Sequence, residues 1–162
     1  MFWGTHIALP VLAASSIELL RLRKKKARLL TNTQIRLIGL AGILPDVLWP
    51  HFSLHSRHNS WTHTLWFLIA VYLVVLIASR RFAPSNWKVF SALFVLGSFL
   101  HILADGFAGG VSFLYPLGEV YGGKYIPWNT WLYSDIVFVA ATVLIVIFLR
   151  KKSSEITTDP KT

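Results

Sequence analysis

His101 and Asp105 form the sharpest chemical pattern in this sequence of 162 residues. On a helix, a spacing of four places both side chains on one face, one turn apart. There they can share a metal ion, or act as a ligand and its hydrogen-bond partner. An ordinary His–Asp hydrogen bond that ties helices together is the alternative. The chain has no cysteine, so any metal must be held by imidazole and carboxylate groups, and disulfides and thiolate chemistry are excluded.

His58 and His63 make a second candidate group. Because a spacing of five does not return to the same helical face, we expect His58 to precede a helix and His63 to point inward from its first turn. Ser60 or Thr62 would cap that helix. The two histidines could then approach one ion from different directions. The alternative is a membrane-interface loop in which Trp61 anchors at the headgroups and the histidines are solvated.

Three further residues are candidates on weaker grounds. Gly42 and Pro45 bend or end a helix before Asp46, and a carboxylate at a helix C-terminus needs a compensating cation unless it is a solvated loop residue. His6 is either an interfacial histidine or another ligand. Asp135 could accept a proton from water, orient a ligand, or be a favourable carboxylate at a helix N-terminus.

Five apolar stretches must position these residues. The composition is 54% hydrophobic with a mean hydropathy of +0.56, more apolar than a soluble protein of this length can bury. We therefore predict an all-α membrane bundle of about five transmembrane helices, a single domain over residues 1–152 with a short, disordered polar tail over 153–162. The second stretch could instead be re-entrant, but a full span is preferred. The stretches cover roughly residues 2–20, 34–49, 62–79, 89–104 and 131–149.

Basic residues predict the orientation. The formal net charge is +9, and all but two of the sixteen Lys and Arg residues fall in alternate connections or after the last stretch. These connections should be cytoplasmic, which places the N-terminus outside and the C-terminus inside. Membrane orientation thus explains the basic cluster at 21–28, and we predict no nucleic-acid partner.

All the histidines then fall at the outer side, together with three carboxylates. Ionisable groups at membrane depth usually face a bundle interior and mark function, so we predict a metal site at this face. A segment rich in glycine and aromatic residues, 106–130, would lie over it as a loop or re-entrant segment. His51 and His55 are left outside the ligand set. Three residues are candidates to contact an anionic substrate, although the two cations could equally be surface charges: Arg57, Lys124 and Tyr115.

Together these pieces resemble the YdjM-like family of membrane-bound, metal-dependent hydrolases. Order and spacing agree over roughly residues 5–117. This chain has Asn59-Ser60 where the family usually has Arg-Gly, and Tyr115-Pro116 where it has Trp-Pro. The matching pieces are Thr5-His6, Gly42-Ile-Leu-Pro-Asp46, His58-Asn-Ser-Trp-Thr-His63, Gly97-Ser-Phe-Leu-His101-Ile-Leu-Ala-Asp105 and Gly110-Val-Ser-Phe-Leu-Tyr115-Pro116.

The resemblance implies a bacterial inner-membrane protein with its active site facing the periplasm. More distantly, the family is similar to zinc-dependent phospholipase C and the P1-type nucleases, whose ligand order is His, Asp, His, then His-x-x-x-Asp. This implies one or two divalent ions, zinc first, with manganese or iron as alternatives. No histidine follows His101, which excludes a trinuclear centre. The implied ligands are His6, Asp46, His63 (or His58), His101 and Asp105.

The function we expect is metal-assisted hydrolysis of a phosphoester or phosphoanhydride in a lipid-like substrate. The ion would lower the pKa of its water to about 7. Asp105 would bridge two ions, His6 and His58 would complete a second site, and Asp135 would accept the proton. A transporter would need polar groups across the membrane, and the cytoplasmic halves show no matching acidic or histidine residues. A protein with a structural or sensing metal is the other alternative, and the oligomeric state is not predicted.

Overall fold

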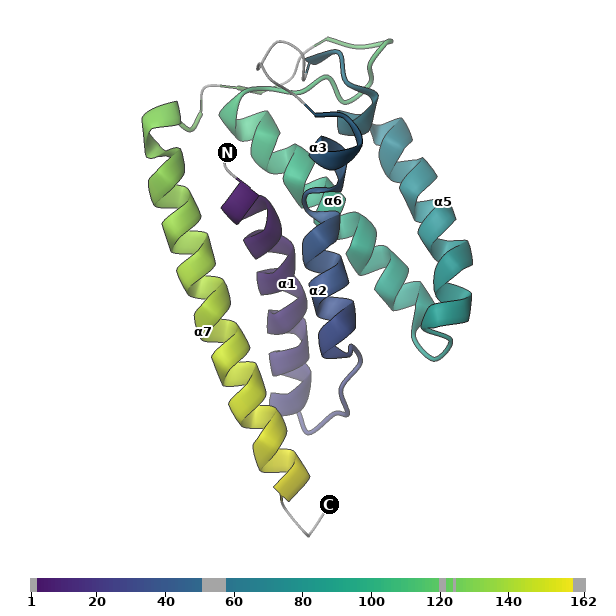
Figure 1. Ribbon diagram of the computed structural model, residues 1–162, viewed down its shortest axis with the longest axis vertical. Helices are drawn as coiled ribbons and strands as arrows, with labels where there is room; N and C mark the ends of the chain where they lie inside the picture. The colour runs from purple at the N-terminus through teal and green to yellow at the C-terminus, as the bar shows by residue number, and fades with distance from the viewer. Residues whose placement is uncertain (1–2, 51–57, 120–121, 124, 159–162) are drawn as a thin grey trace.

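The computed structural model describes residues 3–50, 58–119, 122–123 and 125–158, and its regular elements are helices (Figure 1). The side chains of Trp128 and of residues 156–158 are not described. Short 3-10 turns, η1 and η2, precede two of the helices. In chain order the elements are α1 (Trp3–Arg23), α2 (Asn32–Ala41), α3 (Leu44–Leu48), η1 (Trp61–His63), α5 (Leu65–Phe82), α6 (Trp87–Ala108), η2 (Trp128–Thr130) and α7 (Trp131–Thr158).

Four described helices are long and apolar enough to cross a membrane: α1, α5, α6 and α7. In α5 and α7 most of the apolar surface remains exposed, with Val74 at 66% and Val137 at 62%, as expected for helices that face lipid. This confirms the predicted all-helical membrane bundle. The second apolar stretch is not one of these four, because it forms two shorter helices in place of one long helix.

The second stretch is divided at Gly42 and Ile43 into α2, with ten residues, and α3, with five. α2 crosses α1 so closely that a Cβ on Gly42 would lie 1.9 Å from the backbone oxygen of His6. Pro45 lies in the first turn of α3, where its missing N–H costs nothing. The predicted span over 34–49 is therefore interrupted, although α2 and α3 together still run from the end that holds the α1–α2 connection to the opposite end (Figure 1). The interruption places Asp46 in the first turn of a new short helix, not at a helix C-terminus as predicted.

The helix connections place the basic residues at one end of the bundle. In Figure 1 the connection from α1 to α2, the connection from α5 to α6 and the end of α7 all lie at the bottom, and the N-terminus lies at the top. We call the lower end the basic end and the opposite end the site end. These three segments share one end of the bundle, which agrees with the predicted topology. That the basic end lies in the cytoplasm stays a prediction.

α1 lies at the centre of the bundle, packed against α2, α6 and α7. Small residues allow close packing where neighbouring helices cross, as at Gly97 of α6, where a Cβ would lie 2.8 Å from the Ile38 backbone oxygen. α7 continues to Thr158, so residues 153–158 are helical and the disorder predicted for them was wrong. Lys152 and Glu155 form an ion pair of 2.9 Å on this last part of the helix.

Candidate metal centre

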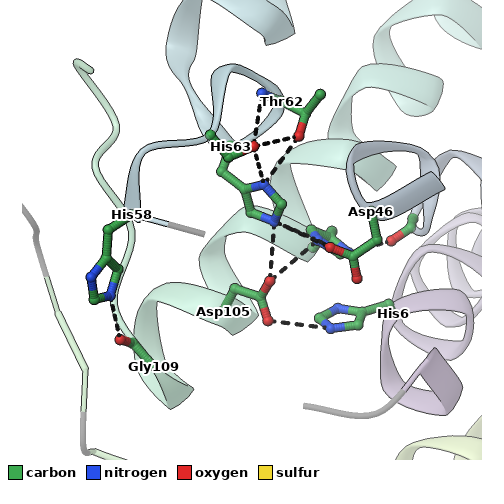
Figure 2. Close-up of polar contacts among 10 residues, drawn as sticks. His6, Asp46, His58, Thr62, His63, Asp105 and Gly109 are labelled. Carbon is green, nitrogen blue, oxygen red and sulfur yellow. Dashed lines mark hydrogen bonds and ion pairs between the residues drawn. The ribbon is translucent and has the colours of Figure 1, made fainter. Parts of the chain in front are cut away.

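Four predicted ligands meet at the site end: Asp46, His63, His101 and Asp105. One ligand atom from each lies within 4.8 Å of the others (Figure 2). Nε2 of His63 is 3.1 Å from Nε2 of His101, and Oδ2 of Asp105 is 3.3 Å from both. Oδ1 of Asp46 is 3.5 Å from both nitrogens. The residues come from α3, η1 and α6, so the fold brings together three separate parts of the chain.

Local structure explains how each segment presents its ligand. α6 carries His101 and Asp105 one turn apart on one face, as the spacing of four predicted. His63 ends η1, a turn that Ser60 caps by accepting from the Thr62 N–H at 3.3 Å. The following helix, α5, is capped by Thr64, whose Oγ1 accepts from Phe67 N–H at 3.2 Å. Ser60 and Thr62 therefore do not cap that helix as predicted, and His63 precedes it.

Hydrogen bonds to the second ring nitrogens orient both imidazoles. Nδ1 of His101 lies 2.7 Å from the Gly42 carbonyl oxygen, which can only accept, so Nδ1 carries the proton and Nε2 presents a lone pair. Nδ1 of His63 lies 3.2 Å from Oγ1 of Thr62 and 3.3 Å from Oγ of Ser60. When Nδ1 donates to one of these hydroxyls, Nε2 of His63 also presents a lone pair to the group. This is the arrangement that fixes histidine ligands in metal sites.

The converging atoms fit a single cation. Two imidazole lone pairs and two carboxylate oxygens face a common point, and such a group of acceptors is electrostatically unfavourable without positive charge between them. Tetrahedral coordination with ligand distances of 2.0–2.1 Å separates neighbouring ligand atoms by about 3.3 Å. The five separations that involve a histidine nitrogen are 3.1–3.5 Å and bracket this value. The donor set therefore fits one four-coordinate divalent ion.

Asp46 is the ligand nearest to solvent. The side chains of His63, His101 and Asp105 are fully buried, whereas that of Asp46 is 13% exposed. Burial alone would raise the pKa of Asp46, but without an ion a proton on Nε2 of His101 or His63 would hydrogen-bond to the carboxylate and hold its pKa below the ordinary value. Within the described residues, the group reaches the surface on the Asp46 side.

His6 contacts the group from outside. Its Nε2 lies 3.3 Å from Oδ1 of Asp105, and its ring centroid is 4.0 Å from that of His101. Asp105 thus directs Oδ2 toward the four-residue group and Oδ1 toward His6 (Figure 2). His6 therefore contacts a member of the group in this structure, and its own role as a ligand stays a prediction.

Asp135 binds the start of α1. Its Oδ1 accepts from the backbone N–H of Thr5 at 3.2 Å and from the Thr5 hydroxyl. A Cβ at Gly4 would lie 2.6 Å from Oδ2, so the backbone of α1 approaches this carboxylate closely. Of the three roles considered for Asp135, the structure favours positioning: the carboxylate ties α7 to the residue before His6.

The other predicted site residues do not join the group. His58 lies apart from it, with Nε2 3.1 Å from the Gly109 carbonyl oxygen (Figure 2). Tyr115 is half-buried, with its ring edge-on to Trp61 at 6.5 Å between centroids. Two predicted substrate contacts, Arg57 and Lys124, lie outside the described part of the chain, as do His51 and His55, which were left outside the ligand set.

The sequence interpretation missed the groups that orient the ligands. Ser60 and Thr62 were assigned only to capping, although their positions three and one residues before His63 allow their hydroxyls to reach its ring. The Gly42 carbonyl has no side-chain pattern that could reveal it. Its contact with His101 depends on where α2 ends against α6.

Comparison with known proteins supports the resemblance seen in the motifs. The family model described as YdjM inner membrane protein matches residues 1–158, well beyond the 5–117 covered by the motifs. No curated protein and no solved structure matches the sequence.

Proposed function

The chain belongs to the YdjM inner membrane protein family, and we propose that it is a metal-dependent hydrolase that acts on a lipid-like substrate at the membrane surface. The bond cleaved would be a phosphoester or phosphoanhydride. The observation that carries the proposal is that ligand atoms of four residues lie within 4.8 Å of one another: Asp46, His63, His101 and Asp105. Such a group has no evident role in packing a helical bundle, because it buries acceptors against one another.

Two imidazoles and two carboxylates suit zinc, with manganese or iron as alternatives. When bound, a divalent ion supplies Lewis-acid polarisation of a phosphoryl oxygen and activates water at neutral pH. The four-residue group accounts for one ion. His6 orients Asp105, and Gly42 together with the hydroxyls beside His63 orients the imidazoles. Asp46, the partly exposed ligand, lies where water and substrate would reach the site.

A groove on the membrane-facing surface supports the lipid-like class of substrate. It lies between α5 and α6, has a volume of about 410 Å³ and is walled almost entirely by apolar side chains. The groove includes Leu65, two residues after His63, and Phe99, two residues before His101. An acyl chain held there would place its polar head beside the metal centre. The phosphoester class rests only on the resemblance that the sequence suggests between this ligand order and that of phospholipase C and the P1-type nucleases.

The periplasmic orientation of the site rests on charge. The metal centre lies at the end of the bundle opposite the basic connections (Figure 1). Since basic connections are retained in the cytoplasm, the site end would face the periplasm.

Metal transport is a weaker alternative. The expectation that the basic half lacks acidic residues was wrong, because Glu18 is fully buried there. Its carboxylate, however, accepts from the backbone N–H groups of Leu29 and Leu30 at 3.0–3.1 Å and lies 3.8 Å from Nε of Arg28. Glu18 thus holds the connection after α1, and it belongs to no second ligand group among the described residues.

Metal analysis of detergent-purified protein, together with a hydrolysis screen of lipid phosphoesters, tests the proposal. We expect one ion per chain and turnover, and His101→Ala and Asp105→Ala should remove both. His58→Ala is the matched control, since His58 lies at the same end but outside the group. Turnover that survives both substitutions would contradict the assignment. A retained ion without hydrolysis of any substrate would favour a structural or sensing metal.

A further inference from the structure

A cavity with both apolar and polar walls lies at the basic end, away from the metal centre. It has a volume of about 220 Å³ and lies where α1, α2 and α7 meet. Its apolar wall is formed by Val11, Ile35, Val146 and Leu149, and its polar residues include Arg36 of α2 and Arg150 of α7. None of these residues takes part in the proposed hydrolysis.

Arg36 and Arg150 bring two positive charges to one cavity from different helices. Both side chains are exposed, and among the described residues neither forms an ion pair. Glu18, the acidic residue of α1 at this end, is already bound to backbone N–H groups of the following connection. Two guanidinium groups without a carboxylate partner favour an anion between them, and phosphate oxygens match the geometry of guanidinium donors.

Ser15 supplies an independent observation. Its side chain is fully buried and lines the same cavity, yet its hydroxyl has no hydrogen-bond partner among the described residues. A buried hydroxyl without a partner is unfavourable, and most such groups in proteins are satisfied. An acceptor within the cavity, such as an ester carbonyl, would satisfy it.

We propose that this cavity binds an anionic phospholipid, with the phosphate between Arg36 and Arg150 and the first part of an acyl chain against the apolar wall. The ester carbonyl would accept from the hydroxyl of Ser15. The cavity lies beside the first turns of α2 and reaches Arg150, where the apolar part of α7 ends and basic residues follow. Such a boundary is where the headgroups of the adjoining leaflet lie. Free phosphate would leave the apolar wall and Ser15 without a partner.

Native mass spectrometry of the full-length protein in detergent can measure this binding. Phosphatidylglycerol, phosphatidylcholine and inorganic phosphate would each be titrated. We expect phosphatidylglycerol to bind tightest, and the double variant Arg36→Gln/Arg150→Gln to weaken it about tenfold or more. Ser15→Ala should weaken it less, and this change leaves folding unaffected because the hydroxyl has no partner to lose.

A matched control separates a site from general attraction to positive charge. Arg23→Gln/Lys26→Gln removes two exposed charges at the same end that do not line the cavity. We expect this variant to bind phosphatidylglycerol as the wild type does. An equal loss in both double variants would overturn the proposal. So would equal affinity for phosphatidylcholine, or inorganic phosphate that binds as tightly as the lipid. Metal content should be unchanged in every variant, which keeps this test separate from that of the hydrolase.

Discussion

Nε2 of His63 lies 3.1 Å from Nε2 of His101, while the other ring nitrogen of each imidazole is within hydrogen-bond distance of a fixed oxygen. The carbonyl of Gly42 forces the proton of His101 onto Nδ1, so its lone pair points at His63. Two carboxylate oxygens complete the surroundings. A positive charge is needed where these four atoms face one another, and that requirement leads to the first two predictions.

Adding a divalent ion to metal-free protein should raise its melting temperature. An ion that binds only the folded state, at about 100 times its Kd, stabilises by about 2.7 kcal/mol. For a chain of this size that corresponds to an increase in Tm of about 5–10 °C. Differential scanning fluorimetry with and without a chelator measures this shift. His101→Ala should abolish it, and a shift that persists in this variant would place the ion elsewhere.

Metal affinity should fall as the pH is lowered from 8 to 5, because protons compete with the ion for the two imidazoles. Imidazoles must be neutral to ligate, so each one that takes up a proton raises the apparent Kd by up to about tenfold per pH unit. Asp46 does not add to this loss, because its lowered pKa keeps the carboxylate ionised across the same range. Competition with a metal-binding dye between pH 8 and 5 gives the profile. Affinity that stays constant down to pH 5 would argue against histidine ligands.

Much of this arrangement follows from the sequence because it is local. The spacing of four in His101 and Asp105 determines a shared face on any helix, and apolar stretches of about 20 residues predict spans. Contacts between helices are not local. The break at Gly42 depends on how closely α1 crosses α2, and His58 lies apart because Nε2 contacts the Gly109 carbonyl. Neither contact leaves a periodic pattern in the sequence.

Gly42→Ala should be severely destabilising. The new Cβ would lie 1.9 Å from the backbone oxygen of His6 and 2.8 Å from a ring carbon of Pro10, so α1 and α2 would have to separate. Single substitutions rarely lower the free energy of unfolding by more than about 4 kcal/mol, and steric conflicts in a packed core are among those that do. We expect Gly42→Ala to approach that value. The separation would also move the carbonyl that orients His101.

Gly106→Ala provides the matched control, because the nearest atom to its added Cβ is a methyl group of Val111 at 3.6 Å, an ordinary contact. This variant should be neutral, or more stable by up to about 1 kcal/mol through higher helix propensity. Thermal unfolding in detergent, with metal content measured in parallel, distinguishes the two variants. Equal stability of both would show that α1 and α2 can separate at little cost.

Asp135→Ala should lower stability more than it lowers turnover. The carboxylate is 9% exposed and holds Thr5 through its backbone N–H and its hydroxyl. The loss of these bonds costs about 1–3 kcal/mol. A proton acceptor would instead lose about 10²–10⁴-fold in kcat.

A double-mutant cycle with Thr5→Ala separates the two roles. If Asp135 acts by holding Thr5, the two substitutions share one interaction and their effects on unfolding free energy are not additive. A large loss of kcat in Asp135→Ala with unchanged stability would restore the proton-accepting role.

His6 should act by orienting Asp105, because its Nε2 lies 3.3 Å from Oδ1 while Oδ2 faces the other ligands. Replacement of a group that orients a ligand typically weakens metal binding about 10–100-fold without changing the number of ions. We expect His6→Ala to bind one ion with this reduced affinity, and His6→Gln to recover part of the loss by donating to Oδ1. Metal counting combined with competition titration measures both quantities. Two ions in the wild type and one in His6→Ala would instead make His6 a ligand, with Asp105 bridging the pair.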